Sequence, residues 1–158
     1  MQILKNIFKK KSRPEEVGNF FIKVQSIIGF KPNSIEHFEK AFTHRSSNRL
    51  DTKGNPLNYE RLEFLGDSML SSVIAAHLYN EAPLGDEGYL TKMRSKIVSR
   101  EHLNELGKGL NLVDLVDSKV PSSHFGENIH GNIFEALVGA IFLDQGYSGC
   151  EKFIYQKV

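Results

Sequence analysis

Three acidic residues stand at helical spacing near the middle of the chain: Glu60, Glu63 and Asp67. Positions i, i+3 and i+7 share one face of an α-helix, and the apolar residues between them fall mainly on the opposite side. Like charges this close destabilise a helix by roughly 0.2–0.5 kcal/mol per pair, so a compensating cation is expected. Spacing alone leaves two interpretations open: a solvated acidic face, or carboxylates that bind a hard, oxygen-preferring metal ion.

A fourth acid, Glu135, lies in a segment of very different character. Residues 131–144 are apolar nearly all round, which predicts a central buried helix. Its small residues Ala136, Gly139 and Ala140 would let another helix approach closely. A lone carboxylate on a buried helix needs a partner or a metal ion. The sequence therefore offers acids on two separate helices that could meet at one site.

The sequences of these two segments resemble those of the ribonuclease III family. Residues 60–68, Glu-Arg-Leu-Glu-Phe-Leu-Gly-Asp-Ser, match that family's signature residue for residue, and Glu-Ala-Leu-Val-Gly-Ala at 135–140 is a second anchor. Thr-His-Arg-Ser-Ser at 43–47 and Asp-Glu-Gly at 86–88, followed by Met93-Arg94, support the resemblance. It spans roughly residues 15–158, the extent of the family's endonuclease domain, as in a bacterial-type ribonuclease III without its double-stranded-RNA-binding domain.

The resemblance implies an all-α, homodimeric endoribonuclease that cleaves double-stranded RNA. Cleavage would use Mg²⁺, with Mn²⁺ as a substitute, and would proceed by attack of a metal-activated water on a phosphodiester. The products would carry 5′-phosphate and 3′-hydroxyl ends with short 3′ overhangs. No small-molecule organic cofactor is expected, and the implied setting is RNA processing, including that of ribosomal RNA, in the cytoplasm.

The same resemblance assigns roles to individual residues. Asp67 and Glu135 would be catalytic, and the metal ligands would be Glu63, Asp67, Asn132 and Glu135. Glu60 and Glu87 would be accessory acids near the RNA. Phe64 would form the dimer interface by inserting into a pocket of the partner subunit; the alternative is that its ring is ordinary core of its own subunit.

Asn132 departs from the family pattern, which usually has an aspartate at this position. An asparagine carbonyl oxygen can still coordinate a hard cation, but one negative charge is lost. We therefore expect weaker metal binding with the ligand geometry kept. A degenerated site would begin with the same change, which leaves a non-catalytic protein as an alternative.

Basic residues near these acids are candidates for contacts with RNA phosphates. Lys92, Lys96 and Arg100 stand four apart, which predicts a stripe on one helix face, and Arg45 belongs to the 43–47 block. A solvated surface is the alternative for the stripe. Beside Arg45, His44 is interpreted as a hydrogen-bonded structural histidine, since catalysis in this family is assigned to carboxylates and metal.

The remaining sequence predicts helices throughout. Periodic apolar residues and breaks at Gly or Pro predict helices near 14–28, 34–42, 57–79, 88–98, 101–107, 128–144 and 147–158, with loops at 48–58, 80–88 and 108–126. No strand-like alternation occurs. The single cysteine, Cys150, excludes an internal disulfide, and no apolar run approaches the roughly 20 residues of a membrane span.

Charge divides the chain into a basic tail at 1–13 and an endonuclease domain at 14–158. The tail holds five of the 20 basic residues and no acid, so the rest carries 15 basic against 19 acidic residues, a formal charge of −4. A frayed tail is the first interpretation; membrane-surface contact, organelle import and phosphate contact are alternatives. A net negative domain is unusual for a nucleic-acid binder, but the excess is no larger than the five proposed site acids.

Two classes of function therefore stay open. One is the metal-dependent endoribonuclease, and the other is a non-catalytic RNA-binding or ribosome-associated domain with the same fold. A hydrolase of small nucleotides is disfavoured, because the sequence has no Gly-rich phosphate loop and no His-Asp metal pair.

Overall fold

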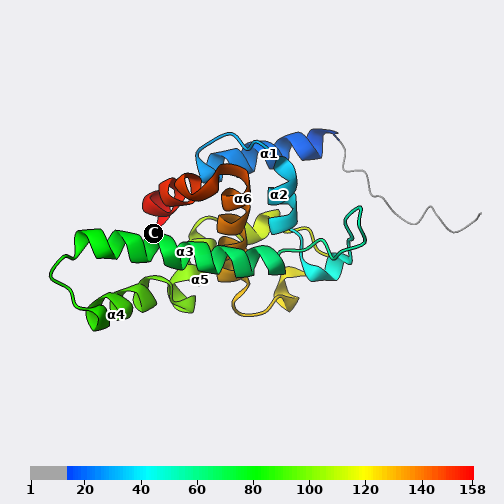
Figure 1. Ribbon diagram of the computed structural model, residues 1–158. Helices are drawn as coiled ribbons and strands as arrows, with labels where there is room; N and C mark the ends of the chain where they lie inside the picture. The colour runs from blue at the N-terminus through cyan, green and yellow to red at the C-terminus, as the bar shows by residue number, and fades with distance from the viewer. Residues whose placement is uncertain (1–13) are drawn as a thin grey trace, which may run out of the picture. The chain divides into compact units, whose positions relative to one another are not determined.

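A computed structural model of the protein describes residues 14–158, and these residues fold into helices and loops (Figure 1). The helices are α1 (Pro14–Ile28), α2 (Ile35–Ala41), α3 (Glu60–Glu81), α4 (Glu87–Ile97), α5 (Arg100–Gly109) and α6 (Ile129–Lys157), with short 3₁₀ turns at Arg45–Ser47, Leu112–Leu115 and Ser122–His124. Over residues 14–158 the only β pairings are two isolated bridges. The predicted all-α class is confirmed, and the predicted tail at 1–13 lies outside the described residues.

The chain divides into two compact units after Lys31. The described part of the first unit is α1, which begins at Pro14 with Glu15 and Glu16 in its first turn. Pro and acids are favoured at helix starts. The helix is followed by Gly29 at φ 81°, a left-handed conformation that glycine adopts without steric cost. Both ends agree with the sequence prediction.

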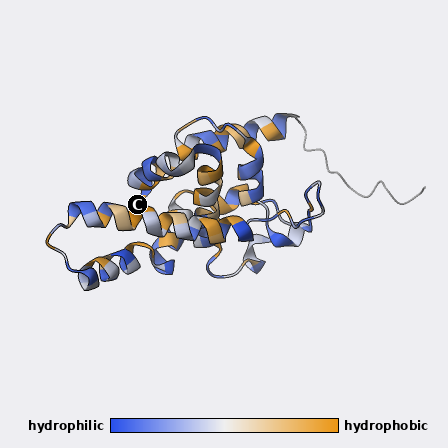
Figure 2. Ribbon diagram, in the orientation of Figure 1, coloured by the Kyte–Doolittle hydropathy of each residue, from blue (hydrophilic) through white to orange (hydrophobic). Residues whose placement is uncertain are grey.

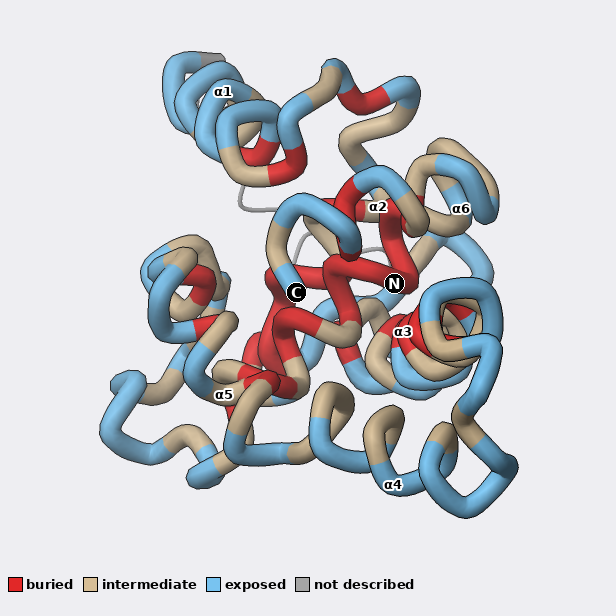
Figure 3. Tube along the Cα trace, turned by 90° about the vertical axis from the view of Figure 1, so that its left-hand side faces the viewer, coloured by how far each residue is buried: buried red, intermediate tan, exposed pale blue. Residues whose placement is uncertain are grey.

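The second unit, residues 32–158, is built around the first half of α6. Ten of the helix residues from Ile129 to Ile141 are buried, and Figures 2 and 3 show this interior as hydrophobic and enclosed. The most extensive helix pair in the unit is α3 against α6, and α5 and α2 also pack on α6. The core of this unit thus lies around the helix that carries Glu135.

Gly146 bends α6 in its second half, with φ 72° and ψ −166°. The sequence predicted two helices, 128–144 and 147–158, and the structure joins them through this kink. Just before the kink, the Asp144 carboxylate accepts hydrogen bonds from the backbone N–H groups of Asn33 (3.0 Å) and Ser34 (2.7 Å). Asp144 therefore satisfies donors at the start of α2, where the Ser34 side chain makes no capping bond.

The start of α3 is three residues later than predicted. The backbone N–H of Leu57 donates to the carbonyl of Arg49 (2.8 Å) and that of Tyr59 donates to the carbonyl of Thr43 (3.0 Å), so the preceding residues pair with the loop instead of the helix.

None of the helices in the described residues is both long enough and apolar enough to cross a bilayer.

Candidate functional site

A cavity of about 680 Å³ opens where α3, α5 and the beginning of α6 meet. It is lined by four acids, one basic residue and a set of polar and apolar side chains: Glu60, Glu63, Phe64, Asp67, Val98, Arg100, Leu103, Asn104, Asn128, Gly131, Asn132 and Glu135. The acids of the 60–68 segment and the acid of the buried helix, about 70 residues apart in sequence, therefore share one cavity.

Two glycines allow this meeting by bringing the backbones of α3 and α6 into direct contact. A Cβ atom added at Gly66 would overlap the carbonyl oxygen of Glu135, and one added at Gly139 would overlap that of Leu62. Any other residue at either position would push the helices apart. Because Glu63 and Asp67 flank Gly66, the crossing fixes them against Glu135.

The carboxylates interact electrostatically across the cavity. Burial, followed by the negative charges of Asp67 and Glu63, raises the pKa of Glu135 to about 7. Burial also raises the pKa of Glu63, with contributions from the charges of Glu60 and Asp67. The positive charge of Arg100 opposes both shifts. The site therefore holds more negative charge than its surroundings neutralise.

Most, but not all, of the residues predicted from the sequence line this cavity. Those that do are Glu60, Glu63, Phe64, Asp67, Arg100, Asn132 and Glu135. Those that do not are Arg45, Glu87, Lys92 and Lys96. Glu87 is exposed at the start of α4, where its carboxylate accepts a hydrogen bond from the Thr91 hydroxyl (3.0 Å).

The predicted basic stripe on one helix is wrong. Helix α4 ends at Ile97, and a new helix begins at Arg100. The break arises because Ser99 acts as an N-cap, its hydroxyl accepting a hydrogen bond from the backbone N–H of His102 (3.3 Å). Lys92 and Lys96 remain on α4, while Arg100 lies on the cavity wall.

The donor chemistry of the cavity fits a hard divalent cation. The carboxylates of Glu63, Asp67 and Glu135 and the amide of Asn132 supply the oxygen atoms that Mg²⁺ prefers. The raised pKa values of Glu63 and Glu135 mark negative charge that a cation would stabilise. Within residues 14–158, no three or more His, Cys, Asp or Glu side chains are already grouped so that they could hold a metal ion. These residues therefore fit a cation by donor type and charge.

His44 is held as a structural residue, as the sequence interpretation proposed. The ring is buried and stacks on Phe125, with centroids 4.6 Å apart, and burial lowers its pKa. Its Nδ1 atom lies 2.8 Å from the Ser46 hydroxyl. Its backbone N–H donates to the carbonyl of Asp117 (2.9 Å).

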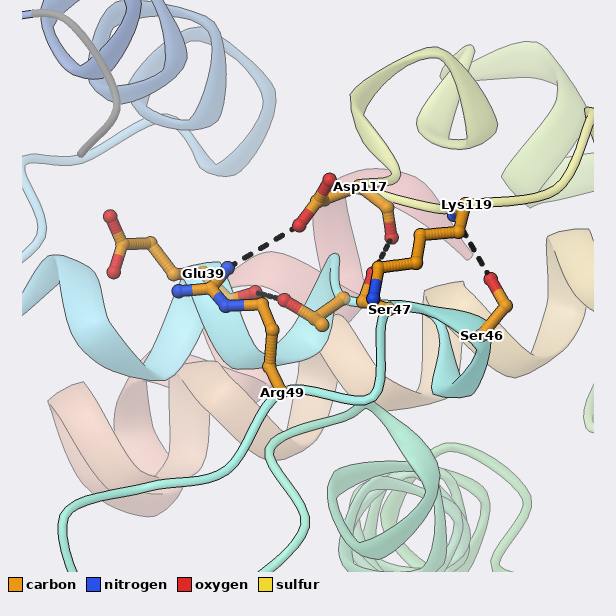
Figure 4. A network of polar contacts seen from close by, with 7 residues as sticks. Glu39, Ser46, Ser47, Arg49, Asp117 and Lys119 are labelled. Atoms are coloured by element: carbon orange, nitrogen blue, oxygen red, sulfur yellow. Dashed lines mark hydrogen bonds and ion pairs between the residues drawn. The ribbon is translucent and has the colours of Figure 1, made fainter. Parts of the chain in front are cut away.

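Further polar contacts fix the rest of this loop against residues 117–119 (Figure 4). The Ser47 hydroxyl donates to the Asp117 carbonyl (3.0 Å), and the backbone N–H of Lys119 donates to the Ser46 hydroxyl (3.1 Å). The anchored loop carries Arg45, whose guanidinium lies 3.6 Å from the Glu60 carboxylate at the edge of the cavity.

Three residues of the site were missed in the sequence. Asn104 on α5 accepts a hydrogen bond from the backbone N–H of Gly131 (2.8 Å) and donates to the Asn128 side chain (3.1 Å), so it fixes the first turn of α6. Tyr59 is buried beside the cavity, and a side-chain hydrogen bond with Asn132 lowers its pKa against the larger raising effect of burial. Only Asn128 had a sequence signal, its place as N-cap residue of the apolar helix.

Comparison with known proteins shows which family this sequence is similar to. The sequence family described as Ribonuclease-III-like matches residues 34–158. The chain is 67% identical over all its residues to a protein of Flavobacterium psychrophilum named Ribonuclease 3, and 45% identical over 132 residues to the Ribonuclease 3 of Bacteroides thetaiotaomicron. It spans 64% of the length of the first and 42% of the length of the second.

Solved structures have a similar fold. The nuclease domain of ribonuclease III from Campylobacter jejuni superposes with a TM-score of 0.73 at 27% identity, covering 85% of this chain and 92% of that domain. The family match extends over both acid-bearing helices and the whole cavity. This chain therefore belongs to the ribonuclease III family.

Proposed function

We propose that this chain is the nuclease part of a Mg²⁺-dependent endoribonuclease that cleaves double-stranded RNA. The observation that carries the proposal is the convergence of Glu63, Asp67, Asn132 and Glu135 on one cavity, in a member of the ribonuclease III family. The products are RNA ends with 5′-phosphate and 3′-hydroxyl groups and short 3′ overhangs. The proposed location of this activity is the cytoplasm, and the bacterial origin of relatives named Ribonuclease 3 supports it.

Asp67 and Glu135 are the catalytic residues in this proposal, and with Glu63 and Asn132 they hold Mg²⁺ or Mn²⁺. When bound, the metal lowers the pKa of a water molecule and stabilises negative charge on the reacting phosphodiester. A bound cation would stabilise the ionised form of the partly buried Glu135, which burial and its acidic neighbours disfavour. The cavity keeps these ligands beside an opening that RNA can reach.

The RNA is held by residues around the cavity. Glu60 and Glu87 are accessory acids near the RNA, and Arg45, Lys92, Lys96 and Arg100 contact phosphates. All four basic residues are exposed and therefore accessible to a duplex. With so few phosphate contacts in this chain, RNA binding should be weak and should fall with salt.

A second copy of the chain completes the nuclease. Phe64 supports this assembly, because the residue is 79% exposed. It lies beside the acidic residues that line the cavity. Insertion of Phe64 into the partner about a two-fold axis would bury it twice. Two cavities would then face opposite strands of one duplex, as a staggered double-strand cut requires. The related Campylobacter jejuni domain is described as having a region involved in dimer formation.

The competing function is a non-catalytic RNA-binding domain, and Asn132 is the observation that favours it. Long double-stranded RNA incubated with the protein, with and without Mg²⁺, separates the two. We expect Mg²⁺-dependent cutting by the wild type and by the control Glu105→Gln, whose side chain is exposed on α5 away from the cavity.

Glu135→Gln should reduce cutting by at least about 100-fold while RNA binding is kept, because a ligand of the metal is lost. Wild-type protein that binds RNA but cuts none with Mg²⁺ or Mn²⁺ would establish the non-catalytic alternative. Wild-type cleavage rates in Glu135→Gln at saturating Mg²⁺ would show that the site is assigned wrongly.

A further inference from the structure

Arg100 is the basic residue among the side chains that line the cavity in the described part of the chain. It is the first residue of α5, directly after the capping Ser99, and its side chain is exposed. Four acids, Glu60, Glu63, Asp67 and Glu135, line the same cavity. The arrangement places one permanent positive charge beside a cluster of negative ones.

The backbone at Arg100 is held in place relative to Glu135 by two contacts between α5 and α6. A Cβ atom at Gly107 would overlap the carbonyl oxygen of His130, so the two helices meet there without side chains between them. One turn earlier on α5, Asn104 accepts the hydrogen bond of the Gly131 backbone N–H (2.8 Å). Arg100 is therefore presented to the cavity by a fixed scaffold, with its long side chain free to move.

Arg100 acts on the carboxylates without a direct ion pair. Within residues 14–158 the ion pairs closer than 4.0 Å are Arg45–Glu60 and Arg49–Asp117. Arg100 nevertheless lines the same cavity as the carboxylates of Glu63 and Glu135, so its positive charge reaches two of the residues that would bind the metal through space.

We propose that Arg100 is the resident counter-ion of this cavity: it partly neutralises the metal-binding carboxylates and thereby competes with the divalent cation, setting the metal concentration that the site requires. This inference rests on the proposed metal-dependent function and adds to it a role for Arg100 that is separate from RNA. A guanidinium and a divalent cation close to the same carboxylates repel each other, so each lowers the affinity of the other. Arg100 is in this sense a positioning residue, acting on the metal through its ligands.

The test is Mn²⁺ binding measured by isothermal titration calorimetry in the absence of RNA. Arg100→Gln should lower the Mn²⁺ dissociation constant by about three- to tenfold at low salt, because one repelling charge is removed, with a smaller change in high salt. The matched control is Lys108→Gln, which removes the same charge from an exposed position of α5 outside the cavity. Arg100→Lys keeps the charge and should stay within about twofold of the wild type.

Two results would overturn the inference alone. A dissociation constant for Arg100→Gln equal to that of Lys108→Gln would mean that Arg100 serves RNA only. Tighter binding in Arg100→Lys to the same degree as in Arg100→Gln would mean that side-chain shape, not charge, is responsible. A wild-type protein that binds no Mn²⁺ at millimolar concentration would overturn both the inference and the proposed function, and so separates the two failures.

Discussion

Two clusters of charged side chains lie in the second unit of the chain, one in the cavity where α3 crosses α6 and one on α4. In the cavity, Glu63 and Glu135 are partly buried; burial raises the pKa of both carboxyl groups, and the charges of neighbouring acids raise them further. On α4 no residue is buried, and Glu87, Lys92 and Lys96 are exposed to solvent. Solvent screens charges on such a surface strongly. Close helix crossing, more than the number of charges, therefore distinguishes the candidate site from its surroundings.

The largest expected effect comes from forcing α3 and α6 apart where they cross. Gly66→Ala should destabilise the fold by about 3 kcal/mol, because the added methyl group meets the Glu135 backbone, which cannot rotate away. Cleavage should fall by about 100-fold or more even in the folded fraction, since the carboxylates would be displaced from one another. Urea unfolding and single-turnover cleavage measure the two effects.

The matched change on α4 is Gly88→Ala. The nearest atom to an added Cβ there is Asp86 Oδ1 at 3.6 Å, an ordinary contact, and alanine favours helix by up to about 1 kcal/mol. We expect unchanged or slightly higher stability. Equal unfolding free energies for the two variants would contradict the distinction between the crossing and α4.

Phe64→Glu should have the next largest effect, because it prevents dimer formation while the residues of the cavity stay in place. A charged side chain in place of the 79% exposed ring cannot be buried in a partner pocket without a large desolvation cost. Sedimentation should give a dimer for the wild type and a folded monomer for the variant, and the variant should no longer cut both strands. A wild-type protein that is monomeric at tens of micromolar would contradict the dimer.

The features that could be predicted from the sequence are those that local chemistry determines. Gly29 ends α1 because a left-handed residue is needed there, and Glu135 stands out because a carboxylate on an apolar helix needs a partner. The 60–68 signature identified α3 as the acid-bearing helix. Gly139 was correctly interpreted as a point of close helix approach, although its neighbour across the interface, Gly66, was not.

The features that could not be predicted depend on residues distant in sequence. The predicted helices 88–98 and 101–107 left Ser99 unassigned, and its role as an N-cap was not predicted, because serine is compatible with both a helix interior and a cap. Packing of α5 on α6 decides between the two. The same break moved Arg100 from the predicted stripe into the cavity. Asn104 gave no signal, because its partners Asn128 and Gly131 lie more than 20 residues away.

Asn132→Asp adds one negative charge inside the cavity and should therefore strengthen metal binding there. The Mg²⁺ concentration for half-maximal cleavage should fall by about three- to tenfold, because an acidic ligand binds a divalent cation more tightly than an amide. The same charge placed on α4 by Ser95→Asp, an exposed position, should change that concentration less than twofold. Loss of all cleavage in Asn132→Asp, with the wild type active, would give the Asn132 amide a role beyond passive ligation.

The smallest expected effect is the pH dependence of stability in the absence of metal. The folded-state pKa of Glu135, about 7, lies above its ordinary value of 4.5. Between these values the folded protein binds more protons at this position than the unfolded chain does, so stability falls as pH rises. The contribution is fully present below about pH 4.5 and is lost as pH rises through about 7.

Urea unfolding of the wild type and of Glu135→Gln measures this contribution, because the difference cancels other groups such as His44, whose pKa is lowered. Allowing for partial solvent exposure of the carboxylate, the wild type should lose about 1–2 kcal/mol relative to the variant between pH 5 and pH 8. Saturating Mg²⁺ should reduce the loss, because a cation stabilises the ionised form. The exposed Glu87 on α4 provides the comparison: Glu87→Gln should leave the wild-type pH dependence in place. If Glu135→Gln kept that dependence as well, the coupling of carboxylates at the α3–α6 crossing would be refuted.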